Sequence, residues 1–193
     1  MERAVDKIMQ YIDEAYTLEE SDKEVLRFGI QAAMELTLNL FISIFILYRL
    51  HMMWEGLLFF AIFIPIRTLA GGYHSDTYLR CLLFSVLTLT GILVASNYME
   101  LPTGLLLVVI LLLEGAVGRI APVVNADRPV SKREYGIFKR RLKIVLLIDG
   151  IFSIFLWRMQ CDKAVNIIAL SLMLIVVTLI LGRIKYKSYQ ISV

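Results

Sequence analysis

A histidine and a cysteine lie seven residues apart in a short polar segment between two long apolar stretches. A cysteine attacks a carbonyl carbon as a thiolate, and a neighbouring imidazole can accept the thiol proton and form an ion pair with the sulfur. His74 and Cys81 are therefore candidates for a general base and a nucleophile. The alternative is a structural role for each, because a single cysteine in an apolar segment usually packs as a small core residue.

The spacing restricts how these two side chains could cooperate. Seven residues of straight helix cover about 10.5 Å, whereas proton transfer needs an approach of roughly 2.6–3.2 Å between heavy atoms. The pair Gly71-Gly72 can turn the chain, since glycine adopts backbone angles that other residues avoid. We therefore expect His74 on a folded-back loop and Cys81 near the N-terminal end of the next helix, where the helix dipole favours a thiolate.

The composition places this segment in an integral membrane protein. The chain has 193 residues, is 59% hydrophobic and has a mean hydropathy of +0.73, whereas soluble domains are about 45–50% apolar. Its apolar runs approach the roughly 20 residues that a helix needs to cross a bilayer. We predict an all-α helical bundle of about six spans, forming one membrane domain over residues 1–193. The candidate spans are 28–48, 53–66, 79–97, 103–121, 144–158 and 164–182.

Two questions about this bundle stay open at the level of sequence. The second and fifth candidate spans are short, and Pro65 at the end of the second favours a break there, so four spans plus two re-entrant segments are the alternative. Residues 1–24 hold apolar residues at helical spacing and predict an amphipathic N-terminal helix that precedes a catalytic bundle over 25–193. This helix lies either on the membrane surface or against the cytosolic ends of the spans.

Basic residues orient the predicted bundle. With the N-terminus inside, sixteen of the twenty lysines and arginines fall in cytosolic segments and three in outer loops. Positive charge accumulates on the cytosolic side of membrane proteins. The asymmetry therefore predicts cytosolic N- and C-termini, and it places His74 and Cys81 at the cytosolic side.

Other charged residues have two interpretations each. A basic run follows the fourth span and either anchors the chain on anionic lipid or docks an acidic substrate tail. Its members are Lys132, Arg133, Lys139, Arg140, Arg141 and Lys143. Polar residues within spans face protein or water, so they either line a substrate chamber or hold the bundle together, with partners in other spans. These are Glu35, Asn39, Glu114, Arg119 and Asp149.

The residue inventory argues against several classes of site. Two histidines and two cysteines, placed on opposing faces by the predicted topology, cannot close a zinc site, and we expect no metal and no cofactor. We also expect no nucleic-acid partner, because the chain offers no soluble module of the kind that binds nucleic acid.

Two blocks of residues carry a resemblance to a known family. The pattern Arg67-x-x-x-Gly71-Gly72-x-His74 followed by Cys81, and the later block Ala121-Pro122-Val123, Asn125, Arg128-Pro129 and the basic run, resemble the AgrB family of membrane peptidases. The resemblance covers essentially the whole chain. It implies Cys81 as nucleophile, His74 as general base, and Arg67, Gly71, Gly72 and Ser75 as the supporting motif.

The resemblance also implies a function. AgrB proteins are cysteine endopeptidases that remove the C-terminal tail of a quorum-sensing propeptide, AgrD, and help to close a thiolactone or lactone ring. It further implies the plasma membrane of a Gram-positive bacterium, an AgrD-like substrate and a homodimer. The rival hypotheses are a small membrane transporter or exporter and a structural subunit of a sensor complex, neither of which needs a reactive thiol.

Overall fold

The fold is described from a computed structural model in which residues 2–15, 20–73, 78–99, 101–123 and 132–186 are described. These residues form helices and connecting turns, with one isolated bridge between Gly71 and Val123. The helices are α1 (Glu2–Ala15), α2 (Glu20–Leu50), α3 (Met53–Ala70), α4 (Tyr78–Tyr98), α5 (Thr103–Ile120), α6 (Lys132–Arg158) and α7 (Asp162–Lys185). The prediction of an all-α membrane protein is confirmed.

The chain divides into two compact units, Met1–Ile46 and Leu47–Val193, and each is described by itself. In the first unit, α1 lies within the segment predicted as an amphipathic helix, and it is joined to α2 by ion pairs. Arg27 lies 2.6 Å from Asp6, and Lys23 lies 2.8 Å from Asp13. Each of these exposed ion pairs contributes at most about 1 kcal/mol to stability. They therefore add little to the stability of the contact between α1 and α2.

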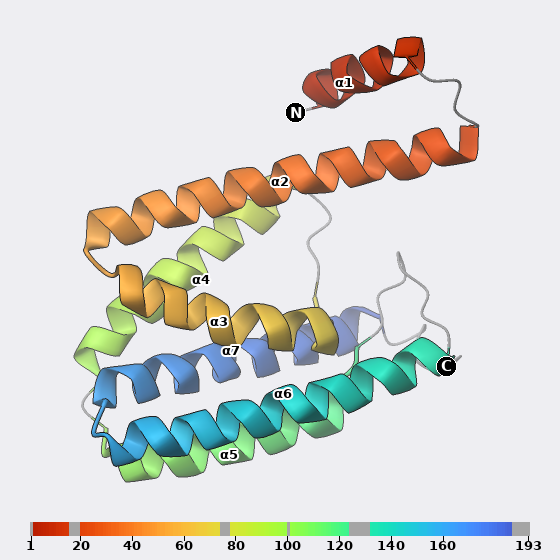
Figure 1. The fold of residues 1–193 in the computed structure, drawn as a ribbon. Coiled ribbons are helices and arrows are strands. Elements are labelled where there is room, and N and C mark those ends of the chain that lie inside the picture. Colours follow the sequence, from red (N-terminus) through yellow and green to blue (C-terminus); the bar gives the residue numbers. More distant parts are fainter. Residues whose placement is uncertain (1, 16–19, 74–77, 100, 124–131, 187–193) are drawn as a thin grey trace. The chain divides into compact units, whose positions relative to one another are not determined.

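Helix α7 is the centre of the second unit, and it contacts α3, α4, α5 and α6 (Figure 1). In its span 56% of the residues are buried, against at most 28% in the other four candidate spans. Aliphatic side chains such as Ile168, Leu172 and Ile175 fill the contacts and are fully buried. The remaining helices are therefore positioned by the faces that they turn toward α7.

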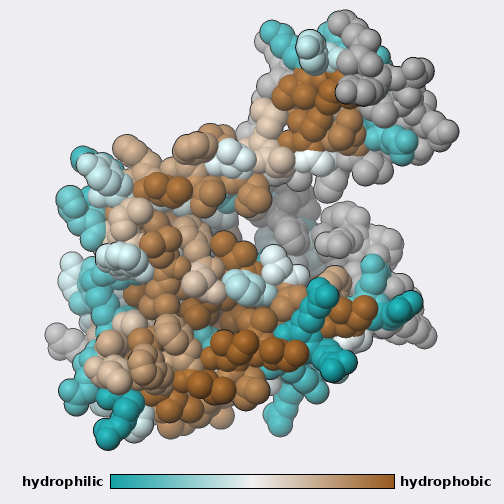
Figure 2. All heavy atoms as spheres, in the orientation of Figure 1, coloured by the Kyte–Doolittle hydropathy of each residue, from teal (hydrophilic) through white to brown (hydrophobic). Residues whose placement is uncertain are grey.

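Much of the outer surface of this protein is apolar, as the brown residues in Figure 2 show. Leu112, Leu147 and Ile151 are each more than 60% exposed. Exposing such apolar surface to water is unfavourable, whereas contact with the hydrocarbon core of a bilayer is not. Among the described residues, five helices are long and apolar enough to cross a membrane, namely α2 from Gly29, α3, α4 from Leu79, α5 and α7. This is a multi-pass membrane protein.

The structure corrects the predicted spans in two places. Helix α3 does not break at Pro65 but continues through it to Ala70. Thr68 Oγ1 shares its hydrogen between the carbonyls of Ile64 and Pro65 in this last part of the helix. The predicted fifth span, 144–158, is the apolar half of the longer helix α6, whose first half is the basic run. For that reason α6 is not among the five apolar helices.

Candidate functional site

The glycine pair makes the predicted turn at the end of α3. Gly71 has φ +70° and Gly72 has φ +120°, a region that side chains disfavour. The Gly71 amide donates to the carbonyl of Arg67 at 3.0 Å and closes the last turn of the helix. A Cβ at Gly71 would overlap the carbonyl oxygen of Val123. The turn therefore requires glycine for both its dihedral angles and its close contact.

Arg67 holds this turn from within the last part of α3. Its Nη1 donates to the carbonyl of Gly71 and its Nη2 donates to the carbonyl of Tyr73. A guanidinium presents several donors in one plane, so a single side chain can fix two carbonyl groups at once. Arg67 thus fixes the backbone between Gly71 and Tyr73.

Two further segments close on the same turn. The Val123 amide donates to the Ala70 carbonyl at 2.8 Å, and the Tyr73 amide donates to the Thr178 carbonyl at 2.9 Å. A Cβ at Gly182 would lie 2.6 Å from the Tyr73 nitrogen. The segment that follows α5 and the last third of α7 therefore hold the glycine turn. This turn, Ala70–Tyr73, is called the motif turn below.

The two family-like blocks of the sequence meet at the motif turn. Gly71 and Val123, about fifty residues apart in the chain, form the isolated bridge. Sequence reasoning found both blocks but missed Thr178 and Gly182, which lie about a hundred residues further along. The available signal was Gly182 itself, a glycine in the last turn of an otherwise bulky apolar helix, where close backbone contact is one reason for its presence.

Cys81 lies in the first turn of α4, as predicted, and its thiol is exposed and not part of a disulfide. The structure thus brings together two members of the predicted motif, Arg67 and the glycine pair. His74 and Ser75 lie outside the described residues, so their roles stay predictions.

The basic run forms the first half of α6. Arg133, Lys139, Arg140 and Arg141 are exposed, while the side chain of Lys132 lies outside the described ones. Exposed cations at the start of an otherwise apolar helix fit both a lipid anchor and a docking surface for an acidic peptide. The two interpretations from sequence both remain.

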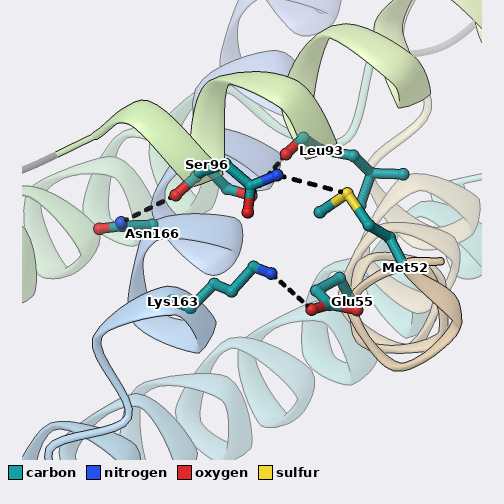
Figure 3. Close-up of polar contacts among 7 residues, drawn as sticks. Met52, Glu55, Leu93, Ser96, Lys163 and Asn166 are labelled. Carbon is teal, nitrogen blue, oxygen red and sulfur yellow. Dashed lines mark hydrogen bonds and ion pairs between the residues drawn. The ribbon is translucent and has the colours of Figure 1, made fainter. Parts of the chain in front are cut away.

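A pocket of about 430 Å³ lies at the other end of α3 and α7. Trp54, Leu58 and Ile167 supply apolar wall, and Glu55 pairs with Lys163 at 2.7 Å beside it (Figure 3). Nearby, Asn166 Nδ2 donates to the Ser96 carbonyl at 3.3 Å and ties α7 to α4. The motif turn lies at the opposite ends of α3 and α7, so this pocket is separate from it.

Nothing in the described ranges indicates a metal centre, because no three histidine, cysteine, aspartate or glutamate side chains gather there.

Comparison with known proteins identifies the family of this chain. The profile of accessory gene regulator B matches residues 5–179. The chain belongs to the AgrB family. A curated relative from Lactiplantibacillus plantarum, named as AgrB-like, is 25% identical over 171 residues, which cover 88% of this chain and 84% of the relative. Another, from Clostridium beijerinckii and also named as AgrB-like, is 32% identical over 170 residues, covering 86% of this chain and 81% of the relative.

No solved structure matches the chain. Membership of the AgrB family gives the protein a role in the accessory gene regulator quorum-sensing system, in the processing of its autoinducer. It also implies an AgrD-type substrate at the membrane. The motif turn and Cys81 both lie within the matched residues.

Proposed function

We propose that this AgrB-family protein is a membrane cysteine endopeptidase that removes the C-terminal tail of an AgrD-type propeptide. Cys81 is the nucleophile and His74 the general base, with Arg67, Gly71, Gly72 and Ser75 in support. The observation that carries the proposal is the fixed motif turn, which leads directly into His74, combined with an exposed Cys81 in the first turn of α4.

The first half of the reaction transfers an acyl group to the enzyme. His74 takes the proton of the Cys81 thiol, and the sulfur attacks the carbonyl carbon of the scissile peptide bond. The C–N bond breaks, the imidazolium returns the proton to the leaving amine, and the tail departs. The core peptide remains as a thioester on Cys81. Backbone amides at the start of α4 are candidates for stabilising the oxyanion.

The second half closes the ring. A cysteine thiol or serine hydroxyl within the bound core peptide attacks the thioester, and the Cys81 thiol leaves with a proton. Water would instead release a linear peptide, so a site that excludes water favours cyclisation. Holding the internal nucleophile beside the thioester raises its effective concentration by orders of magnitude.

The proposed setting follows the charge distribution. Cytosolic N- and C-termini put most basic residues inside and place the motif turn and Cys81 at the cytosolic side of the membrane. The host membrane is the plasma membrane of a Gram-positive bacterium, and the working unit is a homodimer. Cysteine-accessibility labelling of intact cells tests the orientation, because a membrane-impermeant maleimide should then label Cys161 and spare Cys81.

A selective-alkylation experiment separates this peptidase from a transporter. Cys81 and Cys161 are both exposed and free, so Cys161 serves as the internal reference. With iodoacetamide at mildly acidic pH, we expect Cys81 to react faster than Cys161 in detergent, and His74→Ala to remove the difference. Equal rates in the unmodified protein would favour a transporter or a sensor subunit, whose function needs no activated thiol.

Arg67→Lys should lower the processing rate about 10- to 100-fold, because the variant loses a charge-assisted hydrogen bond to a motif-turn carbonyl, an interaction worth about 1.5–3 kcal/mol. The rate of tail removal from a synthetic propeptide measures this, with helical content by circular dichroism as the control. A rate equal to that of the unmodified protein would mean that the guanidinium contacts do not position the site.

The double variant Arg140→Gln/Arg141→Gln tests docking by the exposed basic run. If an acidic tail binds there, the KM of the double variant should exceed that of the unmodified protein several-fold at low salt. This difference in KM should shrink at high salt, because salt screens the attraction between the basic run and the tail. Steady-state kinetics in detergent measure this without a lipid contribution. An unchanged KM at low salt would assign the run to membrane anchoring.

A further inference from the structure

Helices α5 and α6 bring two carboxyl groups together away from the motif turn. Glu114 lies in α5 and Asp149 in α6, and the latter is only 4% exposed. The Glu114 carboxyl lies against the backbone beside Asp149, since a Cβ at Gly150 would be 2.9 Å from Glu114 Oε2. The sequence predicted partners in other spans for such residues, and the partner of Glu114 is a second acid.

Three of the four oxygens of this pair are buried without a hydrogen-bond partner among the described residues. These are Glu114 Oε1 and both carboxyl oxygens of Asp149. Ser153 is fully buried one helical turn after Asp149, on the same face of α6, and its hydroxyl is also without a partner. A buried serine in a helix commonly donates to the carbonyl four residues earlier, so its free hydroxyl indicates a polar site beside the pair.

No opposite charge from the described residues compensates the pair. None of the ion pairs between described residues involves Glu114 or Asp149. Two adjacent carboxylates in a low-dielectric interior repel strongly, and burial of each unpaired charge is costly. A positive charge must therefore come from solution.

The geometry favours a proton over a metal ion as that charge. Among the described residues, no third acidic, histidine or cysteine side chain joins Glu114 and Asp149 to form a metal-binding group. The Glu114 carboxyl does, however, lie against the backbone of Gly150, the residue after Asp149. Once one of the two carboxyl groups carries a proton, it can donate to the other, and the Ser153 hydroxyl can donate to a remaining carboxylate oxygen.

We propose that Glu114, Asp149 and Ser153 form a proton-binding site between α5 and α6. A proton from water forms an O–H bond on one carboxyl group, which neutralises that carboxylate and donates a hydrogen bond to the other. The bound proton joins the two helices within the membrane bundle. This site lies apart from the proposed thiol chemistry and holds whether or not that chemistry is correct.

Infrared spectroscopy of the purified protein in detergent tests the site. At neutral pH we expect the carbonyl stretch of a protonated carboxylic acid, shifted in D₂O and absent from Glu114→Gln/Asp149→Asn. Glu55→Gln is the matched control, since Glu55 pairs with Lys163 and should leave the band unchanged. In thermal unfolding, the unmodified protein should lose stability as pH rises through the titration of the band, while the double variant should not.

The proposal is overturned if the unmodified protein shows no such band at neutral pH, or if the double variant retains it. It is also overturned if the band appears only when Na⁺ is removed at constant pH, because the site would then hold a metal cation. Should the double variant not be recovered folded, Glu114→Gln alone must change the band's position or intensity, and an identical spectrum would equally contradict the proposal.

Discussion

Cys81→Ala is expected to abolish release of the propeptide tail, with a fall in rate on the order of 10⁴-fold or more, as for removal of a covalent nucleophile. Cys81 is exposed in the first turn of α4, so removing its sulfur creates no cavity and should leave the bundle folded. Tail release from a synthetic AgrD-type peptide, followed by liquid chromatography and mass spectrometry, measures the effect.

Cys161→Ala is the matched control for that experiment. It removes the other exposed thiol, at the start of α7 and the opposite end of the bundle from the motif turn, and it should process the peptide at the normal rate. A Cys81→Ala protein that cleaves as fast as the Cys161→Ala protein would exclude Cys81 as the nucleophile.

Gly182→Val should have the second-largest effect, a loss of processing of at least about 100-fold, although Gly182 is remote in sequence from the catalytic motif. A Cβ there would lie 2.6 Å from the backbone of Gly72 and from that of Tyr73. The substitution must displace either α7 or the motif turn, and a shift of about 1 Å at a catalytic group can cost about 10²-fold in rate.

Gly115→Val is the control for the glycine substitution, because a Cβ at Gly115 meets nothing within 4 Å. Both changes replace a helical glycine by the same residue, so any shared effect of helix propensity cancels in the comparison. Equal processing rates for the two variants, with both folded, would show that α7 does not position the motif turn.

The helices were predictable from sequence wherever a long apolar run marked them. Long apolar runs located the six helices from α2 to α7, because a membrane-spanning helix must be apolar along its own length. The predicted break at Pro65 was wrong, since a proline removes only one helical hydrogen bond and α3 continues through it to Ala70. The extent of α6 was also missed, because its first half is basic and lacks hydropathy.

The candidate site was predictable only in its local parts. The glycine pair predicted a turn, and the spacing of Cys81 predicted its place at a helix start; both are confirmed. The contacts from Thr178 and Gly182 were not found, since they are backbone contacts across about a hundred residues. Gly182 indicated a close backbone contact, but its partner in the motif turn depends on how α7 packs against the end of α3.

The acidic pair shows the same limit in another way. The sequence indicated that Glu114 and Asp149 needed partners, because unpaired charge in a membrane is costly. It could not indicate that they lie together, since that depends on the rotation of α5 and α6 about their axes. The expected partner of an acid is a base, so the observed pair is a departure that requires its own explanation.

The central claim is that Cys81 carries the peptide as a thioester, and intact-protein mass spectrometry tests it most directly. After brief mixing with an AgrD-type propeptide and acid quench, the account predicts a mass increase equal to the acyl core peptide, mapped to Cys81 and discharged by hydroxylamine. Release of the tail at the normal rate with no adduct on Cys81, or an adduct that persists in Cys81→Ala, would contradict it.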